Sequence, residues 1–90
     1  MNRLSKRQIS RAGAPLWAQR IAGLRGELRL NQPTFAKRFG VSAMTVSRWE
    51  HGLVEPRRRC YIELGRLAGD PNGSFFLQRA GLQVCLQWQE

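Results

Sequence analysis

The sequence has 90 residues, enough for one domain near the lower size limit for a single hydrophobic core. Fifteen Lys and Arg residues against six Asp and Glu give a net charge of +9, which indicates a polyanionic partner: nucleic acid first, an anionic membrane surface second. Because no apolar run is long enough for a signal peptide or a membrane span, a cytoplasmic location is expected.

The single histidine and the two distant cysteines speak against a zinc site and a His-based nucleophile, so neither a cofactor nor an enzymatic activity is predicted. Cys60 and Cys85 are expected to be reduced core or boundary residues rather than a redox switch.

The first 14 residues are predicted to form a flexible basic arm. They contain four cationic side chains and no acidic one, and Gly13-Ala14-Pro15 closes the segment. Such an arm either enters the minor groove of DNA or supplies only long-range attraction to its phosphates.

A first helix is predicted from about residue 15 to residue 29. Its apolar residues recur at i, i+4, i+7 and i+11: Trp17, Ile21, Leu24 and Leu28. Gly23 and Gly26 either weaken this helix, by about 1 kcal/mol each relative to Ala, or allow a neighbouring helix to approach closely.

Two short helices separated by a glycine turn are predicted between Asn31 and Gly52. Asn31 can cap the first helix, and Gly40 stands where that helix must end in a left-handed residue. Ser42 can cap the second helix. Apolar residues at helical spacing face a shared core: Phe35, Ala36 and Phe39 from the first helix, and Val46 and Trp49 from the second. This pattern is a helix-turn-helix whose outward face carries Ala43, Met44, Ser47 and Arg48.

The segment from about residue 16 to residue 69 resembles the Cro-like, lambda-repressor-like helix-turn-helix family, also called the xenobiotic-response-element type. The resemblance rests on residues at fixed spacing without gaps: Asn31, Gln32, Ala36, Gly40, Ser42, Thr45, Val46, Ser47, Glu50, Gly52 and Pro56. It implies an all-α bundle of four to five short helices that binds double-stranded DNA as a prokaryotic or phage transcriptional regulator. It also implies a structural ion pair between Arg25 and Glu50, which we expect to be only partly buried.

The second helix of this pair, residues 42–51, is expected to present its outward face to base edges in the major groove. Arg48, the one long donor on that face, either contacts guanine bidentately or holds a phosphate. Ala43 and Met44 suit contact with a thymine methyl group, although Met44 has the alternative of packing against its own helix partner. Ser47 can hydrogen-bond to several bases and therefore discriminates weakly.

Polar and basic residues around the recognition helix are expected to bind DNA phosphates: Asn31, Gln32, Lys37, Ser42, Thr45, His51, Arg57, Arg58 and Arg59. By the resemblance, Gln32 bonds a phosphate and braces the recognition helix; the alternative is a solvated glutamine. His51 is expected to offer its backbone N–H, rather than its ring, to a phosphate. The run of three arginines either faces the sugar-phosphate backbone, as the resemblance implies, or is a solvated charged face.

A fourth helix is predicted from Pro56 to about residue 68, with an inward face of Tyr61, Leu64, Gly65 and Ala68. Residues 69–73 are dense in turn formers, and Ser74 can then cap a fifth helix that runs to Ala80 and ends at Gly81. Apolar and polar residues alternate from 83 to 89, which predicts either a strand that needs a partner or a disordered end.

The sequence thus predicts an arm (1–14), a DNA-binding domain (15–82) and a tail (83–90). The predicted function is sequence-specific DNA binding, as a repressor and as a homodimer whose surface includes Phe75, Phe76, Leu82 and the tail. One alternative is an antitoxin whose C-terminal region binds a toxin protein while the helix-turn-helix autoregulates its operon. The other is a charge-driven binder of any nucleic acid or of RNA, which the use of aromatic residues in the core disfavours.

Overall fold

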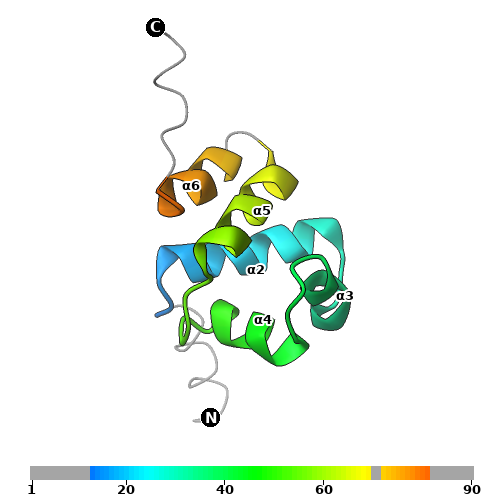
Figure 1. Ribbon diagram of the computed structural model, residues 1–90. Helices are drawn as coiled ribbons and strands as arrows, with labels where there is room; N and C mark the ends of the chain where they lie inside the picture. Colours follow the sequence, from blue (N-terminus) through cyan, green and yellow to red (C-terminus); the bar gives the residue numbers. More distant parts are fainter. Residues whose placement is uncertain (1–12, 70–71, 82–90) are drawn as a thin grey trace, which may run out of the picture. The chain divides into compact units, whose positions relative to one another are not determined.

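The described part of the chain, residues 13–69 and 72–81 of a computed structural model, contains five helices and no strand (Figure 1). The predicted all-α fold is therefore confirmed for these residues. Most of the basic arm (1–12), Leu82 and the tail (83–90, with Cys85) lie outside them. The chain divides into two compact units, Met1–Glu55 and Pro56–Glu90, a division that falls inside the segment 15–82. None of the helices in the described ranges is long and apolar enough to cross a membrane.

The first described helix, α2, spans Leu16–Leu28, close to the predicted range. Ala18, Ile21 and Leu24 are its buried residues, whereas Leu28 is 37% exposed. The predicted apolar stripe is therefore wrong at its last position, because the helix ends there and the chain turns away. The turn is made by Arg29 in the left-handed region (φ 57°), a conformation that costs a non-glycine residue about 1 kcal/mol.

The two glycines inside α2 do not mark a close helix contact. A Cβ atom built on Gly23 or on Gly26 has no neighbouring atom within 4 Å, and both residues are exposed. Of the two predicted roles, close approach of a neighbouring helix is wrong. What remains is the cost of glycine in a helix interior.

Helices α3 (Gln32–Lys37) and α4 (Ala43–Glu50) both begin at the predicted caps. The Asn31 side chain accepts the backbone N–H of Thr34 at 2.9 Å, and Ser42 Oγ accepts the backbone N–H of Thr45 at 3.1 Å. Each bond satisfies one of the N–H groups that the first turn of a helix leaves without an intrahelical partner.

A glycine in the left-handed region follows each helix within three residues of its end. Gly40 (φ 68°) follows α3, and the backbone N–H of Val41 donates to the carbonyl of Ala36 at 3.2 Å. Gly52 (φ 74°) follows α4 and is seated against Pro15, so that a Cβ atom at position 52 would collide with the proline ring. Only glycine therefore suits position 52, both for its conformation and for its space.

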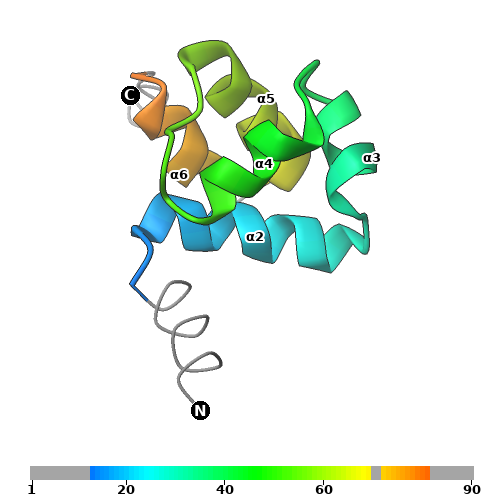
Figure 2. The same cartoon turned by 90° about the horizontal axis from the view of Figure 1, so that it is seen from below.

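In the first unit, α4 packs against both α2 and α3 (Figures 1 and 2). The fully buried side chains come from all three helices: Ala18, Ile21, Phe35, Ala36, Val46 and Trp49. Phe39 joins α3 to α4 edge-on, with its ring centroid 4.9 Å from that of Phe35 and 5.6 Å from that of Trp49. The predicted helix-turn-helix core is therefore confirmed, with Phe39 half-buried at its margin.

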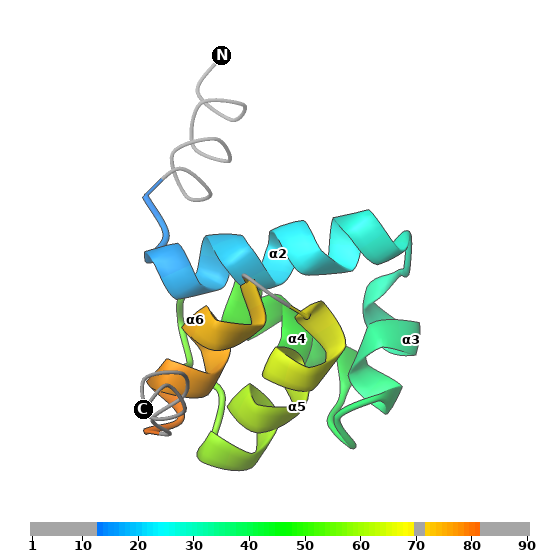
Figure 3. The same ribbon diagram turned by 90° about the horizontal axis from the view of Figure 1, so that it is seen from above.

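The second unit is an antiparallel hairpin of α5 (Arg58–Ala68) and α6 (Asn72–Arg79) (Figure 3). Helix α5 begins two residues after the expected Pro56, because Arg57 is still extended at ψ 162°. Helix α6 begins two residues before the expected Ser74, which lies inside the helix and not at its N-cap. The N–H of Gly73 already bonds the carbonyl of Gly69 at 2.6 Å, so the turn closes earlier than the serine suggested.

Two glycines allow α5 and α6 to pack closely against each other. A Cβ atom on Gly73 would lie 2.6 Å from the carbonyl oxygen of Gly65, and one on Gly65 would lie 2.6 Å from Cγ of Leu77. Next to this contact, the rings of Tyr61 and Phe76 stack with their centroids 6.4 Å apart. Phe76 has no exposed surface, so its predicted place on a dimer surface is wrong: it belongs to the core.

The glycines give opposite predictions for alanine substitution. Gly23→Ala and Gly26→Ala are each expected to raise the free energy of unfolding by up to about 1 kcal/mol, because alanine favours the helix and the added methyl group meets nothing. Gly73→Ala is expected to lower it by about 1–3 kcal/mol, because the backbone of α5 must move. Urea unfolding followed by circular dichroism measures all three, and destabilisation by Gly23→Ala would contradict the open environment of α2.

Candidate nucleic-acid interface

The Glu50 carboxylate, near the end of α4, joins the three helices of the first unit. Arg25 of α2 contacts it twice, through Nε to Oε2 at 2.6 Å and through Nη2 to Oε1 at 3.0 Å. Gln32 of α3 donates its side-chain amide to Oε1 at 3.2 Å. The remaining guanidinium nitrogen of Arg25 donates to the carbonyl of Leu30 in the turn before α3, at 2.9 Å. One carboxylate therefore fixes α4 relative to both of its neighbours.

This ion pair is more buried than the sequence suggested. The Glu50 side chain is 3% exposed, against 21% for Arg25. The hydrogen bond to Glu50 raises the pKa of Arg25, and burial opposes that shift. The pairing expected between Arg25 and Glu50 is present, but the carboxylate has almost no access to water.

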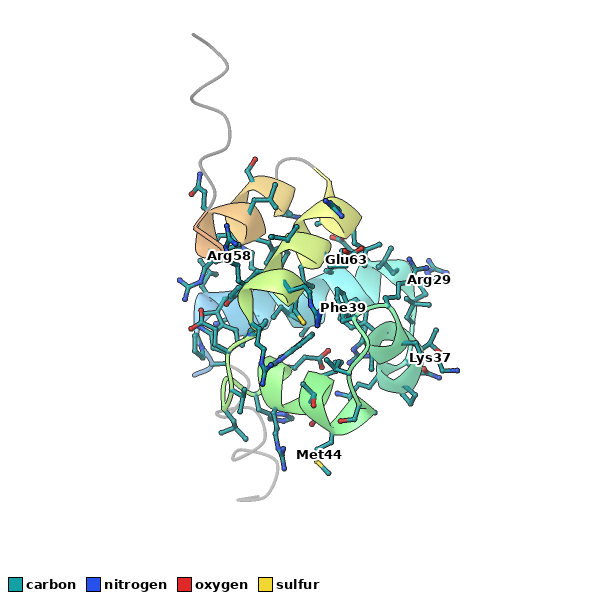
Figure 4. The ribbon with its side chains drawn as sticks, in the orientation of Figure 1. Arg29, Lys37, Phe39, Met44, Arg58 and Glu63 are labelled. Carbon is teal, nitrogen blue, oxygen red and sulfur yellow. The ribbon has the colours of Figure 1, made fainter. Side chains whose placement is uncertain are left out.

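The exposed face of α4 carries the predicted base-reading residues. Met44 is 58% exposed and points away from the ribbon (Figure 4), so packing against a helix partner is not its role. Arg48 is exposed as well, whereas Ala43 and Ser47 are half-buried. The carbonyl of Ser47 accepts two hydrogen bonds from His51. The most accessible pair on this face is thus one apolar side chain and one guanidinium.

The capping residues keep hydrogen-bond donors for an outside anion. The hydroxyls of Ser42 and Thr45 lie 3.0 Å apart, and whichever one accepts in this contact has its own O–H left over. Asn31 uses its carbonyl oxygen as the cap, which leaves the side-chain NH₂ group. Gln32 donates one hydrogen of its side-chain NH₂ group to Glu50, and the second hydrogen remains available as a donor. Their roles in the fold are therefore compatible with the predicted phosphate contacts.

Lys37 lies apart from the base-reading face. It is exposed and points away from α3 on a different side of the unit from Met44 (Figure 4). A phosphate bound by Lys37 would thus belong to DNA that flanks the segment facing Met44.

The mechanism predicted for His51 is wrong. Its backbone N–H, at the C-cap of α4, donates to the carbonyl of Ser47 at 3.0 Å, which is an ordinary helical bond. The ring atom Nδ1 lies 2.8 Å from the same carbonyl and must be the donor there, because a carbonyl only accepts. These bonds use both N–H groups of neutral His51, so Nε2 of the exposed ring can donate to a phosphate only when the ring is protonated.

The arginine run belongs to the second unit, where Arg58 has a structural contact that the sequence did not suggest. Its Nε donates to the carbonyl of Ala80 at 2.9 Å, which ties the start of α5 to the end of α6 (Figure 4). Arg57, Arg58 and Arg59 are all exposed. The neighbouring Cys60 is buried, as expected of a core residue, and burial raises the pKa of its thiol.

No protein-family model, no curated protein and no solved structure matches the chain. Within the described ranges, no group of three or more His, Cys, Asp or Glu side chains could hold a metal ion.

The resemblance implied that Gln32 braces the recognition helix, but neither its partner Glu50 nor the partner of Arg58 had a signal in the sequence. The bond from Gln32 to Glu50 spans 18 residues, and that from Arg58 to Ala80 spans 22. Hydrogen-bond partners so distant in sequence can be identified only when the helices are packed.

Removing either partner of the Arg25–Glu50 ion pair is expected to destabilise the first unit, but the two substitutions should cost different amounts of free energy. Arg25→Ala should lower the free energy of unfolding by about 3–5 kcal/mol, because a buried carboxylate is left unpaired. Glu50→Ala should cost less, since the partly exposed Arg25 can turn to water. Glu63→Ala is the matched control: its side chain is 47% exposed and 3.8 Å from Arg66, so the change should stay within about 1 kcal/mol. Thermal unfolding measures the series, and unchanged stability in Glu50→Ala would refute the structural role.

Proposed function

We propose that the protein is a sequence-specific, double-stranded DNA-binding transcriptional regulator that uses α4 as its recognition helix. The observation that carries the proposal is the fixed presentation of α4. A capped helix of eight residues is held to α2 and α3 through Glu50, with Met44 and Arg48 exposed. The resemblance to the lambda-repressor-like family supports it, because the residues that carry the resemblance supply these caps, turns and contacts.

The geometry suits the division of labour in DNA recognition, where phosphate contacts position the protein and base contacts specify the sequence. In this proposal α4 enters the major groove, which is about 12 Å wide and admits one helix. Met44, Arg48, Ala43 and Ser47 meet base edges. The donors left on Asn31, Gln32, Ser42 and Thr45 bind phosphates, as does the arginine run of the second unit. Lys37 contacts flanking DNA.

Charge and the placement of aromatic residues favour duplex DNA over single-stranded nucleic acid. A net charge of +9 suits a polyanion. Single-strand binders also stack bases on aromatic rings, and each aromatic ring in residues 13–69 and 72–81 is buried or half-buried. A regulator of this kind would work in the cytoplasm, where prokaryotic DNA lies.

A single substitution pair separates sequence-specific reading from general attraction. Binding-site selection from random duplex DNA is expected to enrich a motif. Arg48→Ala should then weaken binding to that motif by about 5- to 150-fold, the worth of one bidentate base contact, and relax preference at one position. Arg66→Ala removes the same charge from a side chain that is 71% exposed on α5, so it is expected to weaken all DNA alike and by much less. Equal losses in the two variants, or no enriched motif, would defeat the proposal.

We also propose that the protein binds as a homodimer and represses by occupying its operator. Three or four base contacts give limited specificity, and a second copy on an inverted repeat doubles them. Sedimentation at high micromolar concentration should therefore show a dimer, and selection should return an inverted repeat. A monomer that selects a single, unrepeated site would contradict this part of the proposal.

A further inference from the structure

We infer that the exposed pair Met44 and Arg48 reads two neighbouring groups on DNA: a C5 methyl group of a pyrimidine and, about one to two base pairs away, a guanine. This inference rests on the proposed function and names the target of that same face. It assigns methyl recognition to Met44 in particular.

The two side chains lie one turn apart on the same face of α4. Residues at i and i+4 are neighbours on a helix surface, and four residues advance about 6 Å along its axis. A recognition helix lies in the groove, where residues three to four positions apart can contact successive bases, so the two side chains meet positions about one to two base pairs apart. Met44 is 58% exposed and Arg48 is exposed, whereas Ala43 and Ser47 on the adjacent face are half-buried.

The chemistry of Met44 restricts what it can recognise. A thioether has no hydrogen to donate and is a weak acceptor, so it cannot read the nitrogen and oxygen pattern of a base edge. The apolar group that the major groove offers is the C5 methyl of thymine. A 5-methylcytosine presents the same group at the same ring position and would be accepted as well.

The neighbouring polar side chains do not compete for this position. The hydroxyls of Ser42 and Thr45 contact each other, and Ser42 Oγ also caps the helix through the amide of Thr45. Arg48 carries the long donor of the face, and a guanidinium pairs bidentately with O6 and N7 of guanine. Met44 and Arg48, one turn apart, together select a short DNA segment that contains both a pyrimidine C5 methyl group and a guanine.

Nucleotide analogues test the inference on the motif that selection enriches. Each thymine is replaced in turn by deoxyuridine, which removes the methyl group and leaves base pairing unchanged. One position in each half-site is expected to lose affinity about three- to fivefold with the wild-type protein. Met44→Ala should bind thymine and deoxyuridine there equally, while Met44→Leu should retain the preference. Unchanged melting temperatures would show that these exposed substitutions leave the fold intact.

The guanine is located in the same way with 7-deazaguanine, which lacks the N7 acceptor. The sensitive guanine should lie about one to two base pairs from the sensitive thymine, and Arg48→Ala should abolish the effect of 7-deazaguanine. Cytosine at the thymine position should bind weakly, and 5-methylcytosine should restore part of the affinity.

A motif without a deoxyuridine-sensitive thymine, sensitivity that persists in Met44→Ala, or a separation above about four base pairs would overturn the inference while the proposed function stands. Failure to enrich any motif would overturn both.

Discussion

The buried carboxylate of Glu50 is the constraint on which the arrangement of the first unit depends. Helices α3 and α4 have six and eight residues, too few for either to be stable alone in water. Their positions must therefore come from tertiary contacts. A buried, unpaired carboxylate would cost several kcal/mol, so packings that leave Glu50 away from Arg25 are strongly disfavoured. The ion pair thus selects one arrangement among several that would bury the same apolar side chains.

The ends of α4 make that arrangement more definite. Ser42 caps its first turn, and Gly52 turns the chain against Pro15 at its last, so neither end of the helix is left without a partner. Such a helix presents its outer face as a rigid surface. In this protein the surface is chemically sparse, with Met44 and Arg48 as its accessible members. A rigid but sparse face suits recognition by few contacts, which is why the proposed function calls for a second copy on the DNA.

The comparison of sequence and structure separates local signals from packing. The caps at Asn31 and Ser42 and the left-handed Gly40 were predictable, because each depends on residues at most four positions away. The exposure of Leu28 and the complete burial of Phe76 were not, since each depends on which surface meets the side chain. The open surroundings of Gly23 and the tight contact of Gly73 look alike in sequence for the same reason.

The sequence by itself determined the helical class, the helix-turn-helix and the identity of its outward residues, because helical periodicity and capping are encoded over three or four positions. Only the tertiary structure decided the role of individual polar groups. It committed Gln32 to Glu50, and Arg58 to the carbonyl of Ala80 in the hairpin of the second unit. Hydrogen-bond partners about twenty residues apart meet only after the helices pack, so the sequence alone does not separate such a group from one that is left to bind an outside partner.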